Sequence, residues 1–556
     1  MRKPSDKNAP PKKKSPIFFA AILLCAVCFI GLLTGCEEQA PEIENLEPRI
    51  GRLGEVLTIR GNGFGDERNE SFITIAGTSP TSSSYLSWSD EEISVQIPEF
   101  GEAGLVYVHR GRTRSNPALF ANESTLPKPA LDSQTVPVIS SVEPASGPVG
   151  SLITILGSNF GSSRGNSGVF FSWNAESPGV EIQSNSNLSN LIEAFENEFG
   201  YEHWSEREIR VRLPDGAVSG NLEVRTQKGN SRPVFFEITG RPGIKTFKDK
   251  KSYLISFSAD FRIERSSLPN ILYVWMPRPV LSSSQRSVEL ISSSVEPYVE
   301  NYRGSSLFQL IDTHAGTNFE IKLFYEADVY TVETAIRNNN PVRLNRPLPL
   351  GTVMVRPTPL IPSENTAIRE QLRTIIGNER LPYPRALRIY NWLISAIKIE
   401  AEPLTGGARD VLEEKKADSY SASLLFCALA RAADIPAQPV AGVLINRYME
   451  TTEHYWAEFW LDGFGWIPLD PALGAGAAPS DFNLRQGHAE YYFGNLDNQR
   501  VAFSRGEHSI SRMTPRGQIT LREREYSLQN IWEEAIGGLA YSSLWSNVTI
   551  TDKHLE

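Results

Sequence analysis

Cysteine and histidine, two common zinc ligands, are scarce in this chain of 556 residues, which has four and seven of them. No HExxH motif occurs, and the two cysteines at CxxC spacing, Cys25 and Cys28, lie within an apolar run. If Cys36 is modified as argued below, Cys427 remains as a single thiol that has no partner for an intramolecular disulfide. We therefore predict no metal site, no cofactor and no disulfide.

Beyond the first 35 residues, acidic residues outnumber basic ones. The first 35 residues hold six of the 55 basic and one of the 65 acidic residues, so the remainder carries a net charge of −15. This acidic balance argues against nucleic acid as a partner of the folded part. The chain is longer than a domain with a single hydrophobic core normally is, so we expect three or four domains.

The N-terminus combines a basic stretch, "MRKPSDKNAPPKKK", with an uncharged apolar run at residues 17–33. The following Leu33-Thr34-Gly35-Cys36 resembles a bacterial lipobox. This resemblance implies a signal peptide at residues 1–35, a lipid on Cys36 and a tether at residues 36–40. An uncleaved membrane anchor is the alternative, and both place the rest of the chain outside the cytoplasm. Glu37, where some inner-membrane lipoproteins have Asp, favours the outer membrane of the cell envelope.

A repeat follows. "PEIENLEPRIGRLGEVLTIRGNGFG" from Pro41 matches "PVISSVEPASGPVGSLITILGSNFG" from Pro137 at an offset of 96 residues. "WSDEEISVQIP" from Trp88 matches "WSEREIRVRLP" from Trp204 at an offset of 116, so the second copy holds an insertion of about 20 residues. β-Branched runs between Gly, Pro and Asn are typical of a small antiparallel sandwich.

Both copies resemble the IPT/TIG domain, which has an immunoglobulin-like fold. The resemblance implies domains at residues 41–121 and 137–239, joined by a linker at residues 122–136. Such domains are usually spacers or adhesive modules. A stalk is one interpretation, and an adhesin that binds through the insertion "NSNLSNLIEAFENEFGYEHW" is another.

Strand-like runs continue after the repeat, and "ILYVWMPRP" is an example. We predict a further β-sandwich at residues 244–350, then an α+β domain at 351–500 that starts with the helical spacing of "LPYPRALRIYNWLISAIKIE". A C-terminal extension occupies residues 501–556, and its stretch "SLQNIWEEAIGGLAYSSLW" is predicted to be a helix.

The α+β domain holds the stretch that could carry chemistry. Asp418 is a good N-cap for a helix whose apolar residues repeat every three or four positions and which Pro436 ends. Ser419 is then in the first turn, where free N–H groups and the helix dipole favour a negative atom. It could be a nucleophile or only part of the cap.

A strand, "HYWAEFWL", follows the helix and carries His454, Trp456, Glu458 and Trp460 on one face. If the "DGFG" turn is centred on Gly463, Asp470 of the next strand lies diagonally opposite His454, within reach of its side chain. A turn with an even number of residues would put Asp470 on the other face.

Residues from about 384 to 474 resemble the transglutaminase-like core, which has a papain-type fold. "LLFCALARAADIPAQPVAG" resembles its nucleophile helix, and "HYWAEFWLDGFGWIPLDPALG" resembles its His and Asp blocks. By position, His454 and Asp470 match the catalytic His and Asp. The family has its nucleophilic Cys seventeen residues before the Pro of the "IP" pair, and here that position is Ser419.

Cys427 is not a substitute nucleophile. It lies about 12 Å along the same helix and about 80° around it from Ser419, so we predict a buried structural thiol. Ser lacks the low pKa that lets Cys wait as a thiolate beside His. We therefore predict a catalytically impaired domain that binds an envelope peptide, protein or glycan in a groove lined by Tyr455 and Trp456. An active Ser-His-Asp acyltransferase, amidase or protease is the alternative.

Overall fold

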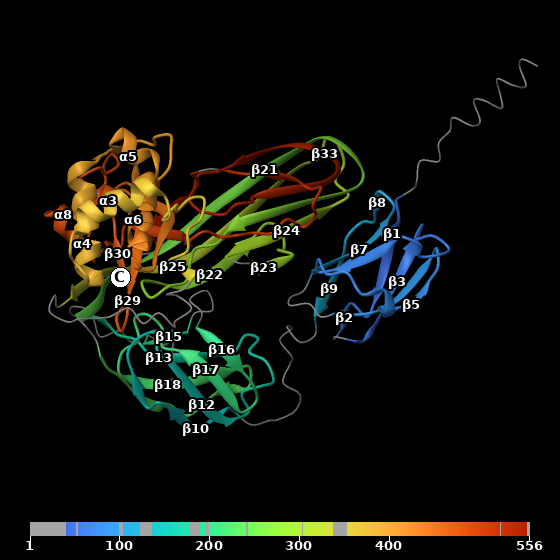
Figure 1. Ribbon diagram of the computed structural model, residues 1–556, viewed down its shortest axis with the longest axis horizontal. Helices are drawn as coiled ribbons and strands as arrows, with labels where there is room; N and C mark the ends of the chain where they lie inside the picture. Colours follow the sequence, from blue (N-terminus) through green and yellow to red (C-terminus); the bar gives the residue numbers. More distant parts are fainter. Residues whose placement is uncertain are drawn as a thin grey trace, which may run out of the picture. The chain divides into compact units, whose positions relative to one another are not determined.

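The computed structural model describes residues 40–51, 54–98, 104–122, 136–176, 190–194, 200–240, 243–302, 304–336, 353–522 and 524–552. The chain forms two compact units, which contain residues 1–126 and 127–556 (Figure 1). The predicted signal peptide and Cys36 lie outside the described residues. Among the described residues, no helix has the length and apolar composition needed to span a membrane.

The first unit is an antiparallel sandwich of two sheets. One sheet has the order β1-β3-β6-β5 and the other β2-β9-β7-β4, with β8 paired to β7. Alternating residues of both sheets, among them Leu57, Ile59 and Val106, are fully buried between them. The elements are β1 (Glu42–Glu47), β2 (Ile50–Gly51), β3 (Val56–Asn62), β4 (Phe72–Ile75), η1 (Ser82–Ser84), β5 (Tyr85–Trp88), β6 (Glu92–Gln96), β7 (Gly104–Arg110), β8 (Thr113–Arg114) and β9 (Ala118–Asn122).

The second repeat has the same sandwich, with sheet orders β10-β12-β17-β16 and β11-β20-β18-β13-β15. The two offsets read from the sequence are confirmed by matched hydrogen bonds. The indole N–H of Trp88 donates to Phe64 O, and that of Trp204 donates to Phe160 O. The strands are β10 (Val138–Glu143), β11 (Ser146–Gly147), β12 (Leu152–Ser158), β13 (Gly168–Ser172), β14 (Ala175–Glu176), β15 (Leu191–Glu193), β16 (Tyr201–Trp204), β17 (Glu208–Arg212), β18 (Gly220–Thr226), β19 (Gly229–Asn230) and β20 (Val234–Ile238).

A nine-stranded sheet built around the 35-residue strand β21 follows. Buried residues from both halves of β21, such as Phe257 and Met276, belong to one hydrophobic cluster, so the sheet encloses its own core. Besides β14, its strands are β21 (Gly243–Pro277), β22 (Gln285–Ser293), β23 (Val299–Tyr302), β24 (Ser305–Ile311), β25 (Asn318–Ile336), β32 (Gln518–Thr520), β33 (Glu533–Trp545) and β34 (Thr549–Asp552).

The C-terminal stretch was predicted to be a helix, and this prediction is wrong. Residues Glu533–Trp545 form strand β33, which pairs antiparallel with β21 from Ala259↔Trp545 to Val274↔Glu533. Burial decides the outcome, because Trp532 and Ala535 lie in the core that β21 helps to enclose. The partner strand is more than 250 residues earlier in the chain, so no local pattern signals this pairing.

The α+β domain has a four-stranded antiparallel sheet of order β30-β29-β28-β31. Helices α3, α4, α5 and α6 gather beside this sheet (Figure 1). The elements are α3 (Thr366–Ile376), α4 (Pro382–Ala396), β26 (Lys398–Ile399), α5 (Asp410–Glu414), β27 (Lys416–Ala417), α6 (Ser419–Ala432), β28 (Ala437–Ile445), β29 (Thr451–Leu461), β30 (Gly465–Leu469), α7 (Pro471–Gly474), α8 (His488–Tyr491) and β31 (Arg500–Arg505).

The second repeat packs tightly onto the parts of the chain that follow it. The ring of its Trp173 packs against those of Phe247 and Tyr330, with ring centroids 5.4 and 5.1 Å away. Its hydrophobic cluster also takes in Trp460 and Trp466 of the α+β domain. Aromatic pairs of this kind contribute roughly 0.5–1.5 kcal/mol each beyond their buried area. The second repeat is therefore a fixed part of the larger unit.

Part of the insertion takes part in this packing. Residues Leu191–Glu193 form strand β15 at the edge of the second repeat, and Ile192 is 1% exposed. Arg286 Nη2 donates to Leu191 O. Ile192 and Ala194 are thus buried and do not contribute to an adhesive surface, whereas Asn190, Glu202 and His203 are exposed, so the adhesin interpretation stays a prediction; residues 177–189 and 195–199 lie outside the described part of the chain.

Candidate functional site

Ser419 is the first residue of α6, as predicted from its N-cap. The Asp418 side chain accepts a hydrogen bond from Ser421 N at 2.8 Å, and Ser421 Oγ accepts one from Asp418 N at 3.1 Å. These two bonds form a capping box that fixes the first turn of the helix. Ser419 is half-buried there.

A segment close to the C-terminus also holds this first turn. Arg524 Nη1 pairs with Asp418 Oδ2, which also accepts a hydrogen bond from Leu404 N at 2.9 Å. The Arg524 guanidinium lies 4.6 Å from the centre of the Tyr420 ring. The residues on both sides of Ser419 are therefore tied to a segment more than 100 positions later in the chain.

His454 and Asp470 meet on one face of the central sheet. The register pairs Ala457 with Leu469, so the β29–β30 turn is centred on Gly463 and the predicted register is confirmed. His454 Nε2 lies 2.9 Å from Asp470 Oδ2 and donates to the carboxylate. Both side chains are buried, with exposures of 4% and 0%.

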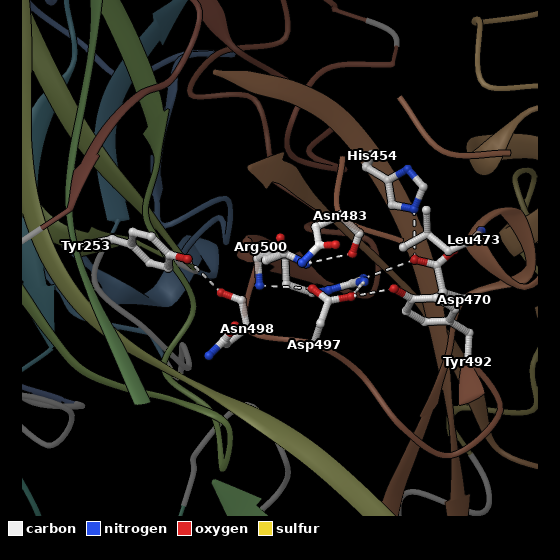
Figure 2. A network of polar contacts seen from close by, with 10 residues as sticks. Tyr253, His454, Asp470, Leu473, Asn483, Tyr492, Asp497, Asn498 and Arg500 are labelled. Atoms are coloured by element: carbon white, nitrogen blue, oxygen red, sulfur yellow. Dashed lines mark hydrogen bonds and ion pairs between the residues drawn. The ribbon is translucent and has the colours of Figure 1, made fainter. Parts of the chain in front are cut away.

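Arg500 of β31 links this pair to a second buried acid (Figure 2). Its Nη1 lies 3.0 Å from Asp470 Oδ2 and its Nη2 lies 3.0 Å from Asp497 Oδ2. Tyr492 OH donates to the same Asp497 oxygen at 2.9 Å. The remaining oxygen of Asp470 accepts from Leu473 N at 3.0 Å and that of Asp497 from Gln499 N at 2.9 Å, so every carboxylate oxygen of the two acids has a partner.

The charges of this network keep both acids ionised. Burial acts to raise the pKa of Asp470, but the charges and hydrogen bonds of His454 and Arg500 outweigh it and leave the pKa below its usual range. Burial likewise acts to raise the pKa of Asp497, and Arg500 again reverses the effect. Because Asp470 binds a full cation as well as His454, its charge is shared between the two.

The first turn of α6, which carries Ser419, packs beside strand β29, which carries His454. The rings of Tyr420 and Tyr455, which follow Ser419 and His454 in the chain, lie 5.0 Å apart, so the start of α6 is next to the start of β29. Among the described residues, however, no hydrogen bond joins Ser419 to His454, and none engages the second ring nitrogen of His454.

Tyr455 and Trp456 do not line one common groove. As neighbours in a strand they point to opposite faces of the sheet. Tyr455 packs with Tyr420 and Leu528, and Trp456 packs with Leu473 and other residues on the His454 face. Each is 4% exposed.

Cys427 is fully buried, and burial raises the pKa of its thiol to about 12. This thiol is therefore neutral and enclosed in the core of the domain, as predicted. Among the described residues, no group of three or more His, Cys, Asp or Glu side chains is arranged to hold a metal ion.

Comparison with known families agrees with this architecture. The family model of the IPT/TIG domain matches residues 41–121 and 137–238. The model of the transglutaminase-like superfamily matches residues 369–471, which include α6 and the His454–Asp470 pair. The chain carries two IPT/TIG domains and a transglutaminase-like domain.

Individual relatives cover parts of the chain. An uncharacterized protein of Haemophilus influenzae is 29% identical over 185 residues, which is 27% of this chain and 49% of that protein. A cyclomaltodextrin glucanotransferase of Paenibacillus macerans is 32% identical over 89 residues, 16% of this chain and 12% of the enzyme. The chain thus spans about half or less of the length of these curated relatives.

A solved structure from Cytophaga hutchinsonii, provisionally described as a cysteine protease, is 14% identical. The similarity covers 56% of this chain and 93% of that one, with a TM-score of 0.37.

The structure adds four residues that the sequence did not single out. Arg500, Asp497 and Tyr492 extend the His454–Asp470 pair, and Arg524 extends the cap of α6. An acid and a base three positions apart, next to the apolar run "VAF", were the available signal for Asp497 and Arg500.

Proposed function

We propose that the transglutaminase-like domain is a non-catalytic binding or scaffold module of a lipid-anchored protein of the bacterial cell envelope. Its ligand is an envelope peptide, protein or glycan. The observation that carries the proposal is Ser419, a hydroxyl at the nucleophile position that makes no hydrogen bond to His454 among the described residues.

Three physical arguments support an impaired site. A serine hydroxyl is not ionised in advance and needs the His to remove its proton during attack. In this chain His454 donates to Asp470, and Asp470 also binds the Arg500 cation, which takes part of the charge that would stabilise a protonated His454. In addition, Arg524 and Asp418 clamp the turn that carries Ser419.

A turnover assay tests this proposal. Cleavage and acyl transfer on soluble envelope peptides are compared for the wild type and Ser419→Ala. We expect equal, background rates for both proteins. Turnover by the wild type that Ser419→Ala abolishes would overturn the proposal.

A serine-dependent acyltransferase, amidase or protease is the second candidate. The buried, hydrogen-bonded His454–Asp470 pair favours it, because this is the arrangement that orients a general base. Ser419→Cys separates the two candidates further. If the introduced thiol is alkylated quickly and the rate depends on His454, the base reaches the nucleophile position; a slow rate that His454→Ala leaves unchanged supports the non-catalytic module.

The anchor has its own test. Cys36 after the apolar run supports lipidation, which adds two acyl chains that hold the protein at a membrane. We expect a diacylglyceryl group on Cys36 by mass spectrometry of the mature N-terminus. We also expect Cys36→Ser to remain unprocessed, and an unmodified mature N-terminus would contradict the lipoprotein assignment.

A further inference from the structure

The outer face of one sheet of the first IPT/TIG domain is apolar. In the sheet of β2, β9, β7 and β4 (Figure 1), residues such as Val106 and Phe120 point into the sandwich, so their neighbours along each strand point outward. The outward residues Ile50, Leu119 and Phe72 are 49%, 46% and 41% exposed. The solvated face of an antiparallel sheet normally carries polar residues, and neighbouring exposed apolar residues often mark a contact surface.

The strand register joins these residues into one surface. Leu119 of β9 is opposite Leu105 of β7, and Ile50 of β2 is opposite Ala121, two residues after Leu119. At the other end of β7, the ring of His109 stacks on that of Phe72 in β4, with centroids 4.5 Å apart. We call this surface the outer apolar face, and it consists of Ile50, Phe72, Leu105, Tyr107, His109 and Leu119.

The second IPT/TIG domain has a different face on the matching sheet. At the offset of 116 residues, Asn221 and Glu223 take the positions of Leu105 and Tyr107. Glu223 forms an ion pair with Arg225 on the same strand. The fold therefore does not require apolar residues at these positions. Their presence in the first domain indicates a contact that the second domain does not make.

Acidic residues are kept away from this sheet of the first domain. Its described strands β2, β4, β7, β8 and β9 contain no Asp or Glu, whereas they contain His109, Arg110 and Arg114. Residues 41–121 as a whole hold 12 acidic and seven basic residues, so the distribution is uneven. A carboxylate on this sheet would oppose contact with the phosphates of lipid headgroups, and arginine favours it.

The proposed anchor brings the first domain closer to a membrane than any later part of the chain. Strand β1 begins at Glu42, and the tether between Cys36 and Pro41 spans at most roughly 18 Å. A surface held this close to lipid is present at a high effective concentration, so weak contacts are enough to keep it bound. An apolar or basic surface beside a lipid chain is the kind of second signal that makes anchoring stable.

We propose that the outer apolar face of the first IPT/TIG domain rests on the lipid surface that holds the anchor. Ile50, Leu119 and Phe72 contact the headgroup region, and the first domain is a second attachment point beside the lipid on Cys36. The proposal rests on the lipid anchor proposed above and is independent of the role of Ser419.

A dye on the outer apolar face tests this contact without the native lipid. The protein used begins at Gln39, contains every described residue, and is attached by an N-terminal histidine tag to nickel-chelating vesicles of phosphatidylcholine and phosphatidylglycerol. Cys427 is then its only cysteine and is fully buried, so an introduced cysteine is labelled selectively. We expect an environment-sensitive dye on Leu119→Cys to brighten and shift to the blue when the protein is on vesicles.

Leu86→Cys is the matched control for the dye. Leu86 is 55% exposed and belongs to β5 of the other sheet, so we expect the same dye there to keep its emission in water. An equal response at both positions, or no response of Leu119→Cys, would overturn the proposal.

Residues taken from the second domain provide a further test. Leu105→Asn together with Tyr107→Glu, added to the labelled Leu119→Cys protein, should abolish the response to vesicles. Leu86→Glu is the control, because it places an acid on the other sheet, and we expect it to leave the response unchanged. An unchanged response in the double variant, with its circular dichroism spectrum preserved, would contradict the proposed contact.

A single substitution keeps the test valid if the double variant does not fold. Ile50→Ser introduces the residue that the second domain has as Ser146, and we expect it to weaken the dye response. A response unchanged by Ile50→Ser would then contradict the proposed contact.

Other occupants of the face give different results. A dye response of Leu119→Cys that rises with protein concentration in the absence of vesicles would identify a second copy of the chain and overturn the proposal. Failure of the anchor is seen separately, because mass spectrometry of Cys36 tests the lipid and the tagged protein tests the face.

Discussion

Replacing Arg500 by methionine would leave two buried carboxylates without their cation. Asp470 and Asp497 are 0% and 1% exposed, and each has an oxygen 3.0 Å from the Arg500 guanidinium. Removing one partner of a buried ion pair costs about 3–5 kcal/mol. We expect a loss of this size in the transglutaminase-like domain at pH 7, a large share of the about 5–15 kcal/mol by which a domain is normally stable.

The effect should depend on pH in one direction. The pKa values of Asp470 and Asp497 are lowered in the folded state, so their stabilising contribution is present above the unfolded value of about 3.9 and is lost as the pH falls through the folded values. Without Arg500, burial and the missing cation raise the pKa of both carboxyls. The deficit of Arg500→Met is therefore largest near pH 7 and shrinks as the pH falls toward 4.

Hydrogen exchange followed by mass spectrometry measures this locally, which matters because a chain of several domains does not unfold in one step. Amides of β28 to β31 are monitored at pH 7 and at pH 4.5. Arg447→Met is the matched control, because Arg447 pairs with Asp481 at the surface and such pairs contribute about 0–1 kcal/mol. Equal exchange in Arg500→Met and Arg447→Met at pH 7, or a deficit that grows at pH 4.5, would refute the reasoning.

Three further predictions concern the framework of the site. Gly442→Ala places a Cβ 2.0 Å from Val501 O, so we expect a loss of about 1–3 kcal/mol or more, seen as a lower melting temperature by circular dichroism. Lys245→Met leaves the buried Asp215 carboxylate without its cation, which we expect to lower the stability by about 3–5 kcal/mol. Limited proteolysis should then cut the second IPT/TIG domain faster than in the wild type, while residues 41–121 are cut at an unchanged rate. Cys427 should resist alkylation in the native chain and react after urea unfolding, which mass spectrometry of its peptide measures; modification of the native protein would contradict its burial.

Local signals account for the parts of the fold that the sequence predicted correctly. The start of α6 follows from the side chain of Asp418, which caps the helix through bonds to a residue three positions away. The β29–β30 register follows from alternation along one strand and from the centre of a short turn at Gly463. The equivalence of the two repeats rests on matched residues such as Trp88 and Trp204.

Contacts between distant segments account for what was missed. Strand β33 contains Gly537 and Gly538 and runs beside β21, and the mixed apolar spacing of its sequence fits a helix as well as a strand. Arg524 reaches Asp418 across 106 positions, and Arg500 reaches Asp470 across 30. A single sequence without homologues indicates that a buried charge needs a partner. It does not identify the residue that supplies this partner.

Labelling of Ser419 by a fluorophosphonate probe tests the central claim most directly, because the probe reacts with a serine only when a base activates it. The full chain and its His454→Ala variant are incubated with the probe, and the fraction of Ser419 modified is measured by mass spectrometry. The non-catalytic account predicts no modification above that of denatured protein in either form. Stoichiometric modification of Ser419 that disappears in His454→Ala would contradict it and establish a working Ser-His-Asp triad.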